Sequence, residues 1–216
     1  MSSTEPNGEK STGLERMILF SDAVFAIAIT LLVLDIRLPA NVGAADFADH
    51  FDELLPRIAS YALSFFVIGA YWVAHNRFYI HVIRYDNRLL WLNLLLLLFV
   101  AFIPFPTSLV ADAGSSRNVI IFYAATITLT GLVMYANWWY ATSRHRLVAP
   151  DLSARENWYV GARTLAVPLV FLLSIGAALL NAPTVAHILW GAAALVALLP
   201  TFSQSPRAQT PKSSSR

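Results

Sequence analysis

The sequence predicts an all-α, polytopic membrane protein with six transmembrane helices and with both termini in the cytoplasm. Hydrophobic residues make up 57% of the 216 residues and charged residues only 13%, whereas a soluble domain has roughly 25% charged residues. Six apolar runs each approach the ~20 residues that a helix needs to cross the hydrocarbon core. Most lysine and arginine residues fall in the tails and in every second connection between the runs, which predicts the orientation of the helices in the membrane.

The predicted transmembrane helices cover residues 16–38, 55–77, 89–111, 118–140, 159–180 and 184–202. Pro104 and Pro106 are expected to bend or break the third helix, and Pro168 to kink the fifth. Asn181 to Pro183 form a tight link between the last two helices, because proline suits the first turn of a helix. We therefore expect one six-helix transmembrane domain over residues 14–202.

The two ends of the chain differ from this domain in composition. Residues 1–13 and 203–216 are rich in Ser, Thr, Pro, Gly and charge. Such segments bury too little apolar surface to fold, so both are predicted to be disordered tails.

The orientation follows from the positions of the basic residues. Eleven lysine and arginine residues fall in the two tails and in the second and fourth loops, whereas three fall on the opposite side. Cytoplasmic segments carry the excess of basic residues, so both termini are predicted to be cytoplasmic. The first loop is then external, and it is acidic, with Asp46, Asp49, Asp52 and Glu53.

Several classes of function are disfavoured by what the sequence lacks. There is no cysteine, no HExxH or GxSxG motif, and no pair of carboxylates at helical spacing inside a predicted span, so we expect neither an enzyme nor a metal centre or other cofactor. The basic residues form no stripe with aromatics, which argues against nucleic acid as a partner. The lipid bilayer is the partner that the composition requires.

Polar residues inside the predicted spans are few, and each is costly unless it has a partner or a purpose. They are Ser21, Asp22, Thr30, His75, Asn76, Asn93, Asn137, Arg163 and His187. Asp22, His75, Asn93 and Arg163 are expected at a similar depth in the cytoplasmic half. Two interpretations stay open: hydrogen bonds that hold helices together, or a proton relay or ion site. The partner of Asp22 among these residues is not fixed by the sequence.

The first predicted helix carries an apolar stripe at the helical period. The stripe consists of Phe20, Val24, Ile27, Thr30, Leu31 and Leu34. Arg16 lies at its cytoplasmic end, and Ser21 and Asp22 lie ~120–140° away, turned towards other helices. Periodicity alone also allows a lipid-facing or packed stripe in which Thr30 bonds to its own backbone.

A family resemblance rests on two motifs. Arg16, Phe20, Ser21 and Asp22 form the pattern R-x-x-x-F-S-D at the start of the first helix, and Trp72 and His75 form W-x-x-H in the second. Together with the six-helix plan, these motifs resemble the lysosomal potassium channel family called transmembrane protein 175, especially its single-repeat bacterial homologues. The resemblance covers the chain apart from its tails.

This resemblance implies a potassium-selective cation channel with passive flux, built as a homotetramer in a bacterial plasma membrane, with potassium as the permeant ion. Its first helices would line the pore through a constriction at Ile27 and through Thr30, Leu31 and Leu34. A network of Arg16, Phe20, Ser21 and Asp22 would hold the helix, with Trp72, His75, Asn93 and Arg163 as supporting residues. The family has no T-V-G-Y-G filter, and this sequence contains none.

A second hypothesis stays open. In it the chain is a proton-coupled secondary transporter that uses a cluster of Asp22, His75 and Arg163 inside the membrane. It predicts gradient-coupled, saturable flux instead of passive flux.

Overall fold

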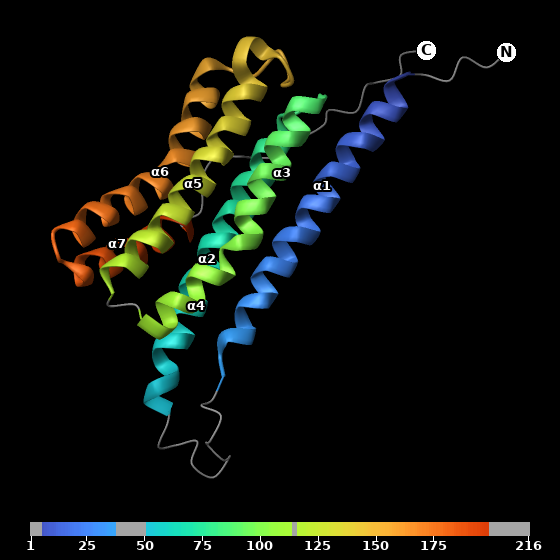
Figure 1. Ribbon diagram of the computed structural model, residues 1–216. Coiled ribbons are helices and arrows are strands. Elements are labelled where there is room, and N and C mark those ends of the chain that lie inside the picture. The colour runs from blue at the N-terminus through green and yellow to red at the C-terminus, as the bar shows by residue number, and fades with distance from the viewer. Residues whose placement is uncertain (1–5, 38–50, 114–115, 199–216) are drawn as a thin grey trace, which may run out of the picture.

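The computed structural model describes residues 6–37, 51–113 and 116–198, which form an all-helical bundle (Figure 1). The elements in chain order are α1 (Pro6–Leu31), the 3₁₀ turn η1 (Leu32–Asp35), α2 (Phe51–Ile80), α3 (Asn87–Phe102), α4 (Pro104–Ala113), α5 (Arg117–Thr142), the 3₁₀ turn η3 (Ser143–His145), α6 (Ala154–Leu179) and α7 (Pro183–Leu198). Five helical stretches are long and apolar enough to cross a membrane, with α3 and α4 counted as one, and a shorter apolar helix follows at Pro183–Leu195. The predicted all-α class is confirmed.

The third span breaks where the prolines predict it. α3 ends at Phe102 and α4 begins at Pro104, because proline has no N–H and its ring collides with the preceding turn. Side chains then tie the break to its neighbours: the Ser64 hydroxyl lies 2.8 Å from that of Thr107 and 3.0 Å from that of Tyr123. These hydroxyl groups join α2, α4 and α5 inside the bundle.

α5 and α6 approach each other closely at a glycine. A Cβ on Gly131 would lie 2.6 Å from Cγ of Pro168, so only a residue without a side chain fits there. α6 continues through Pro168, which means that the proline is accommodated inside one helix instead of ending it. The link to α7 is short, and Asn181 adopts a left-handed φ of 56°, a conformation that asparagine tolerates better than most residues.

The loops at one end of the bundle are held together by backbone and side-chain bonds. Val82 and Val148 form an antiparallel bridge between the α2–α3 and α5–α6 connections. Asp86 caps α3 by accepting from the Leu89 amide at 2.9 Å, and it also accepts from the Tyr140 hydroxyl at 2.6 Å. We call this assembly of residues 81–86 and 146–149, with Tyr140, the loop platform.

The first helix begins earlier than the composition predicts. α1 starts at Pro6, so residues 6–13, which were expected to belong to a disordered tail, are helical. The extra turns meet the loop platform: a Cβ on Gly13 would lie 2.8 Å from Cζ of Tyr85. A helix that has already formed extends at little cost, and this contact supports the extension. Residues 1–5 and 203–216 of the predicted tails lie outside the described residues.

The arginine-bearing α2–α3 and α5–α6 connections lie at the same end of the bundle as the start of α1 (Figure 1). A chain that crosses a membrane repeatedly has every second connection on the same side, and these segments are arranged in that way. Which side of the membrane this end faces stays a prediction from the basic residues. Asp46 and Asp49 of the predicted external loop lie outside the described residues, whereas Asp52 falls in the first turn of α2.

Candidate functional site

α1 lies along one edge of the bundle (Figure 1), where it packs on α2 and α3. Its inward side buries Phe25, Ala28 and Leu32 almost completely. Its outward side exposes large apolar side chains: Phe20 54%, Ile27 57%, Leu31 44% and Leu34 54%. We call these four residues together with Thr30 the α1 outer face. Nothing in the described part of the chain covers it.

Thr30 is the polar member of the α1 outer face. Its side chain is exposed, and Oγ1 donates a hydrogen bond to the Ile27 carbonyl at 2.9 Å. Because the hydroxyl hydrogen is used inside the helix, the oxygen presents only its lone pairs outward. The α1 outer face is therefore apolar except for one hydrogen-bond acceptor per chain.

The opposite side of α1 is attached to α3 and α2 through Asn93. Asn93 donates from Nδ2 to the Ser21 hydroxyl at 2.9 Å, and Ser21 donates to the Met17 carbonyl at 2.8 Å. The Oδ1 atom of Asn93 lies 3.1 Å from Nε2 of His75. Ser21, His75 and Asn93 are all buried, so these bonds fix the rotation of α1 in a region without competing water.

The direction of these hydrogen bonds defines which ring nitrogen of His75 carries the proton. Since Asn93 uses its amino group on Ser21, its oxygen must accept from His75, which places the histidine proton on Nε2. The other ring nitrogen, Nδ1, is buried and has no hydrogen-bond partner among the described residues, and the ring packs on Phe25 and Tyr79 with centroids 5.4 and 4.5 Å away. A second proton on Nδ1 would have no acceptor, so the site suits a neutral histidine.

Asp22 is bonded to Trp72, one of the supporting residues that the family resemblance implies, and not to His75, Asn93 or Arg163. Nε1 of Trp72 donates to Asp22 Oδ1 at 2.9 Å, which gives α2 a second attachment to α1. The indole is 39% exposed and the carboxylate is half-buried. This bond satisfies one carboxylate oxygen near the edge of the bundle, and the second oxygen has no bond to the described residues.

The structure does not bring Arg163 to Asp22. Arg163 lies on α6, close enough to Arg77 for their charges to interact, and α6 packs on α5 and α7 instead of α1. The expected cluster of Asp22, His75 and Arg163 is therefore wrong in its third member. Equal depth in the membrane, which the sequence gives, does not place two helices side by side.

Arg16 and Phe20 are likewise not part of the hydrogen-bonded network. Both side chains are exposed on α1, and Arg16 makes no hydrogen bond or ion pair within the described residues. Sequence reasoning missed the Met17 carbonyl and the packing of Phe25 on His75. The spacing of four residues between Met17 and Ser21 is the signal that predicts the first of these contacts.

The described ranges contain no group of three or more His, Asp or Glu side chains placed to hold a metal ion. The chemistry that the site offers is instead an apolar face with a hydroxyl oxygen, on a helix whose other side is anchored.

The comparisons with known proteins agree on one family. The sequence profile described as "Endosomal/lysosomal potassium channel TMEM175" matches residues 16–104. A potassium channel of Streptomyces collinus is 35% identical over 195 residues, which are 88% of this chain and 93% of that protein. A potassium channel of Chamaesiphon minutus is 36% identical over 146 residues, which are 65% of this chain and 72% of that protein.

The fold matches a solved structure of the same family. The crystal structure of a lysosomal potassium-selective channel TMEM175 homolog from Chamaesiphon minutus superposes with a TM-score of 0.73 at 28% sequence identity. The match covers 87% of this chain and 100% of the other.

Proposed function

The chain belongs to the TMEM175 channel family, and on that premise we propose that it is a potassium-selective cation channel with passive flux, whose pore is lined by the α1 outer face. The relatives from Streptomyces collinus and Chamaesiphon minutus are named potassium channels. The observation that carries the proposal is the α1 outer face itself. It combines 57% exposure of Ile27 with a Thr30 oxygen that is free to accept.

A pore of this kind needs several copies of the chain. A single α1 outer face is open on one side, so copies must surround the ion path, and the family resemblance makes a homotetramer the assembly that we propose. Large apolar side chains at the same height would then form a ring. A narrow apolar ring disfavours continuous water and gates by dewetting, which is the role that we assign to Ile27.

Discrimination between cations needs ligands, which isoleucine does not offer. Thr30 lies one turn from Ile27 on the same face, and its hydroxyl hydrogen is held by the Ile27 carbonyl. Hydroxyl oxygens from several copies would thus face a passing cation with their lone pairs. Replacement of part of the hydration shell by such oxygens is one way in which channels favour potassium.

The hydrogen bonds behind α1 have a structural part in this proposal. Asn93 and Trp72 attach α1 to α3 and α2 through Ser21 and Asp22. They hold the helix in the rotation that turns the α1 outer face away from the bundle. Membrane helices commonly use such interhelical bonds in place of a hydrophobic driving force.

The transporter hypothesis uses a cluster that is incomplete in the structure. It required a cluster of Asp22, His75 and Arg163, but Asp22 is bonded to Trp72 and Arg163 lies near Arg77. His75 is committed to Asn93 through its proton. A passive channel uses none of these groups for proton exchange.

The proposal is tested by flux measurements on the full chain reconstituted in liposomes. We expect passive potassium flux that exceeds sodium flux in the wild type, and faster flux of both ions in Ile27→Asn, because a polar ring no longer dewets. Leu173→Asn is the matched control, since Leu173 is a similarly exposed side chain (65%) on α6. A wild type without passive cation flux, or equal behaviour of the two variants, would contradict the proposal.

A further inference from the structure

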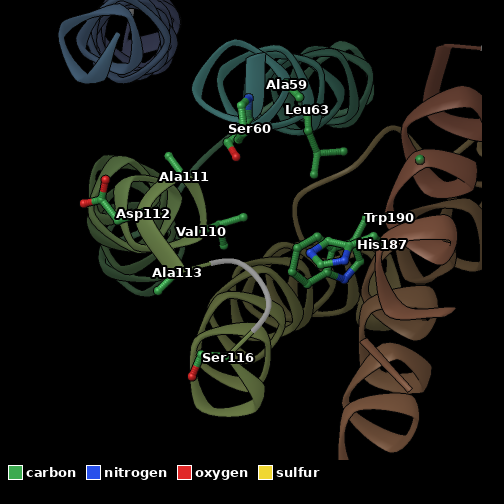
Figure 2. A pocket seen from close by; sticks show the side chains of 12 residues that line it. Ala59, Ser60, Leu63, Val110, Ala111, Asp112, Ala113, Ser116, His187 and Trp190 are labelled. Carbon is green, nitrogen blue, oxygen red and sulfur yellow. The ribbon is translucent and has the colours of Figure 1, made fainter. Parts of the chain in front are cut away.

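A groove of about 850 Å³ lies between α2, α4 and α7, at the end of the bundle where α4 gives way to α5 (Figure 2). Its walls are mostly apolar, and they include Pro56, Leu63, Val110 and Trp190. Figure 2 shows α2 and α4 on one side of the space and α7, with Trp190, on the other. The groove is separate from the α1 outer face, because no residue of α1 lines it.

One hydroxyl of a largely buried residue, Ser60, opens onto this groove. Ser60 is only 8% exposed, makes no hydrogen bond within the described residues, and directs its oxygen into the space (Figure 2). Ser64, one turn further along α2, shows the contrast, since its hydroxyl bonds to both Thr107 and Tyr123. The Ser60 oxygen is not fully buried, because it opens onto the groove, so its hydrogen can be donated to an acceptor atom of an occupant.

Two further polar side chains border the same groove, and one of them, His187, is placed to donate into it. Ser116, at the N-cap position of α5, makes no capping bond with its side chain, but it is exposed and its hydroxyl points away from the space (Figure 2). The His187 ring stands edge-on against Trp190 at 4.9 Å and has no hydrogen bond to the described residues. Asp112 is also on the rim, but Arg57 holds its carboxylate at 2.7 Å and offsets its negative charge.

The position of the groove limits what can fill it. Its α2 and α4 walls belong to the spans Leu54–Ile80 and Asn87–Ala113, so the bilayer borders it. Apolar walls of this size with a few convergent polar groups are typical of a ligand site. An occupant from the bilayer needs an apolar part for the walls and acceptor atoms for the donors.

We propose that the groove binds a phospholipid. One acyl chain lies against Leu63, Val110 and Trp190, and the ester carbonyl and phosphate oxygens accept hydrogen bonds from Ser60 and His187. The glycerol ester region of a phospholipid offers acceptors and no donors, which complements two side chains that offer unused donors. The Arg57–Asp112 pair leaves the rim without a net charge to repel the phosphate.

The test uses a phospholipid that carries a photoreactive diazirine in one acyl chain, mixed into liposomes with the full-length protein. After illumination, tandem mass spectrometry locates the labelled residues. We expect labels concentrated on residues 56–63 and 187–191, above the level on the exposed surface of α6. Gly191→Phe places a ring in the groove, because Gly191 lines it and a Cβ there meets nothing within 4 Å, and it should lower this labelling several-fold.

Gly176→Phe is the matched control. Gly176 is also helical, and a Cβ there also meets nothing within 4 Å, but it lies on α6 outside the groove, so labelling of the groove should stay at the wild-type level. If Gly191→Phe does not fold, as judged by gel filtration and circular dichroism, Ala59→Phe fills the same groove from α2. Labelling spread evenly over groove and α6 surface, or crosslinking of the groove residues to a second copy of the chain instead of lipid, would overturn the proposal.

Discussion

Asn93 donates a hydrogen bond to the Ser21 hydroxyl over 2.9 Å, and this contact joins α3 to the helix that carries the proposed pore face. The bond lies on the side of α1 opposite Ile27 and Thr30. The orientation of an exposed apolar face therefore depends on a buried polar contact behind it. Helix–helix hydrogen bonds in membranes commonly have this positioning part.

Asn93→Ala should destabilise the protein more than the loss of a few side-chain atoms would suggest. It removes the amide that serves both Ser21 and His75 and leaves the buried Nε2 proton of His75 without an acceptor, which costs about 1–3 kcal/mol, whereas Ser21 keeps its bond to the Met17 carbonyl. We expect a clearly lower thermal unfolding midpoint in detergent, followed by circular dichroism. Asn118→Ala, at an exposed position of α5, is the control, and an equal loss in both variants would argue against a structural Asn93.

Asp22→Asn distinguishes the two functional hypotheses. An asparagine carbonyl can still accept from Trp72 Nε1, which is the bond that Asp22 makes in the structure. We expect the variant to assemble and to keep passive potassium flux in liposomes, whereas Asp22→Leu should assemble poorly. A proton-coupled transporter would instead lose its flux in Asp22→Asn, because a neutral amide cannot exchange protons.

The sequence is sufficient to predict most of the fold. A run of ~20 apolar residues forms an α-helix in a bilayer, since every backbone polar group must be paired inside the segment. The break at Pro104 follows from the missing proline N–H. The helical start of α1 could not be predicted from composition, which carries no information on contacts such as that of Gly13 with Tyr85, far apart in the sequence.

The candidate site was predictable only in part. Periodicity gives the stripe that includes Ile27 and Leu34, because residues on one helix have a fixed angular relation. It does not say which helices are neighbours, and this is why Arg163 was placed with Asp22 although it lies near Arg77. The groove beside Ser60 combines residues from α2, α4, α5 and α7, and no local pattern predicts such a combination.

Gly131→Ala should destabilise the packing of α5 on α6. The added Cβ would lie 2.6 Å from Cγ of Pro168, and a proline ring inside a helix has little room to move, so overpacking should cost about 1–3 kcal/mol. Gly69→Ala is the matched control, since a Cβ there meets nothing within 4 Å. We expect a lower unfolding midpoint for Gly131→Ala alone, and identical midpoints would contradict the close approach.

The cap at Asp86 makes part of the stability depend on pH. Burial acts to raise the pKa of Asp86, but hydrogen bonds from Tyr140 and from the Leu89 and Arg88 amides, together with the charge of Arg146, outweigh it and hold the pKa below the ordinary value of 3.8. The ionised cap therefore stabilises the fold above this ordinary value, and the contribution is lost as the pH falls through the lower folded-state pKa.

Asp86→Ala should accordingly lower stability by about 0.5–2 kcal/mol at neutral pH, the usual effect of losing a cap. The difference in unfolding midpoint between Asp86→Ala and the wild type should disappear in strongly acidic buffer. Tyr140→Phe removes one donor to the carboxylate and should reproduce part of this difference. A difference that is unchanged from neutral to strongly acidic pH would contradict the assignment.

The most direct test of the central claim, that the α1 outer face lines a water-filled ion path, is thiol accessibility. The chain has no cysteine, so Leu34→Cys carries a single thiol at a side chain that is 54% exposed. A charged, water-soluble thiol reagent should block potassium flux through Leu34→Cys in liposomes and leave Leu173→Cys, on the exposed surface of α6, unaffected. If the thiol at position 34 stays unmodified, and the flux through both variants is unchanged by the reagent, the α1 outer face does not line the pore.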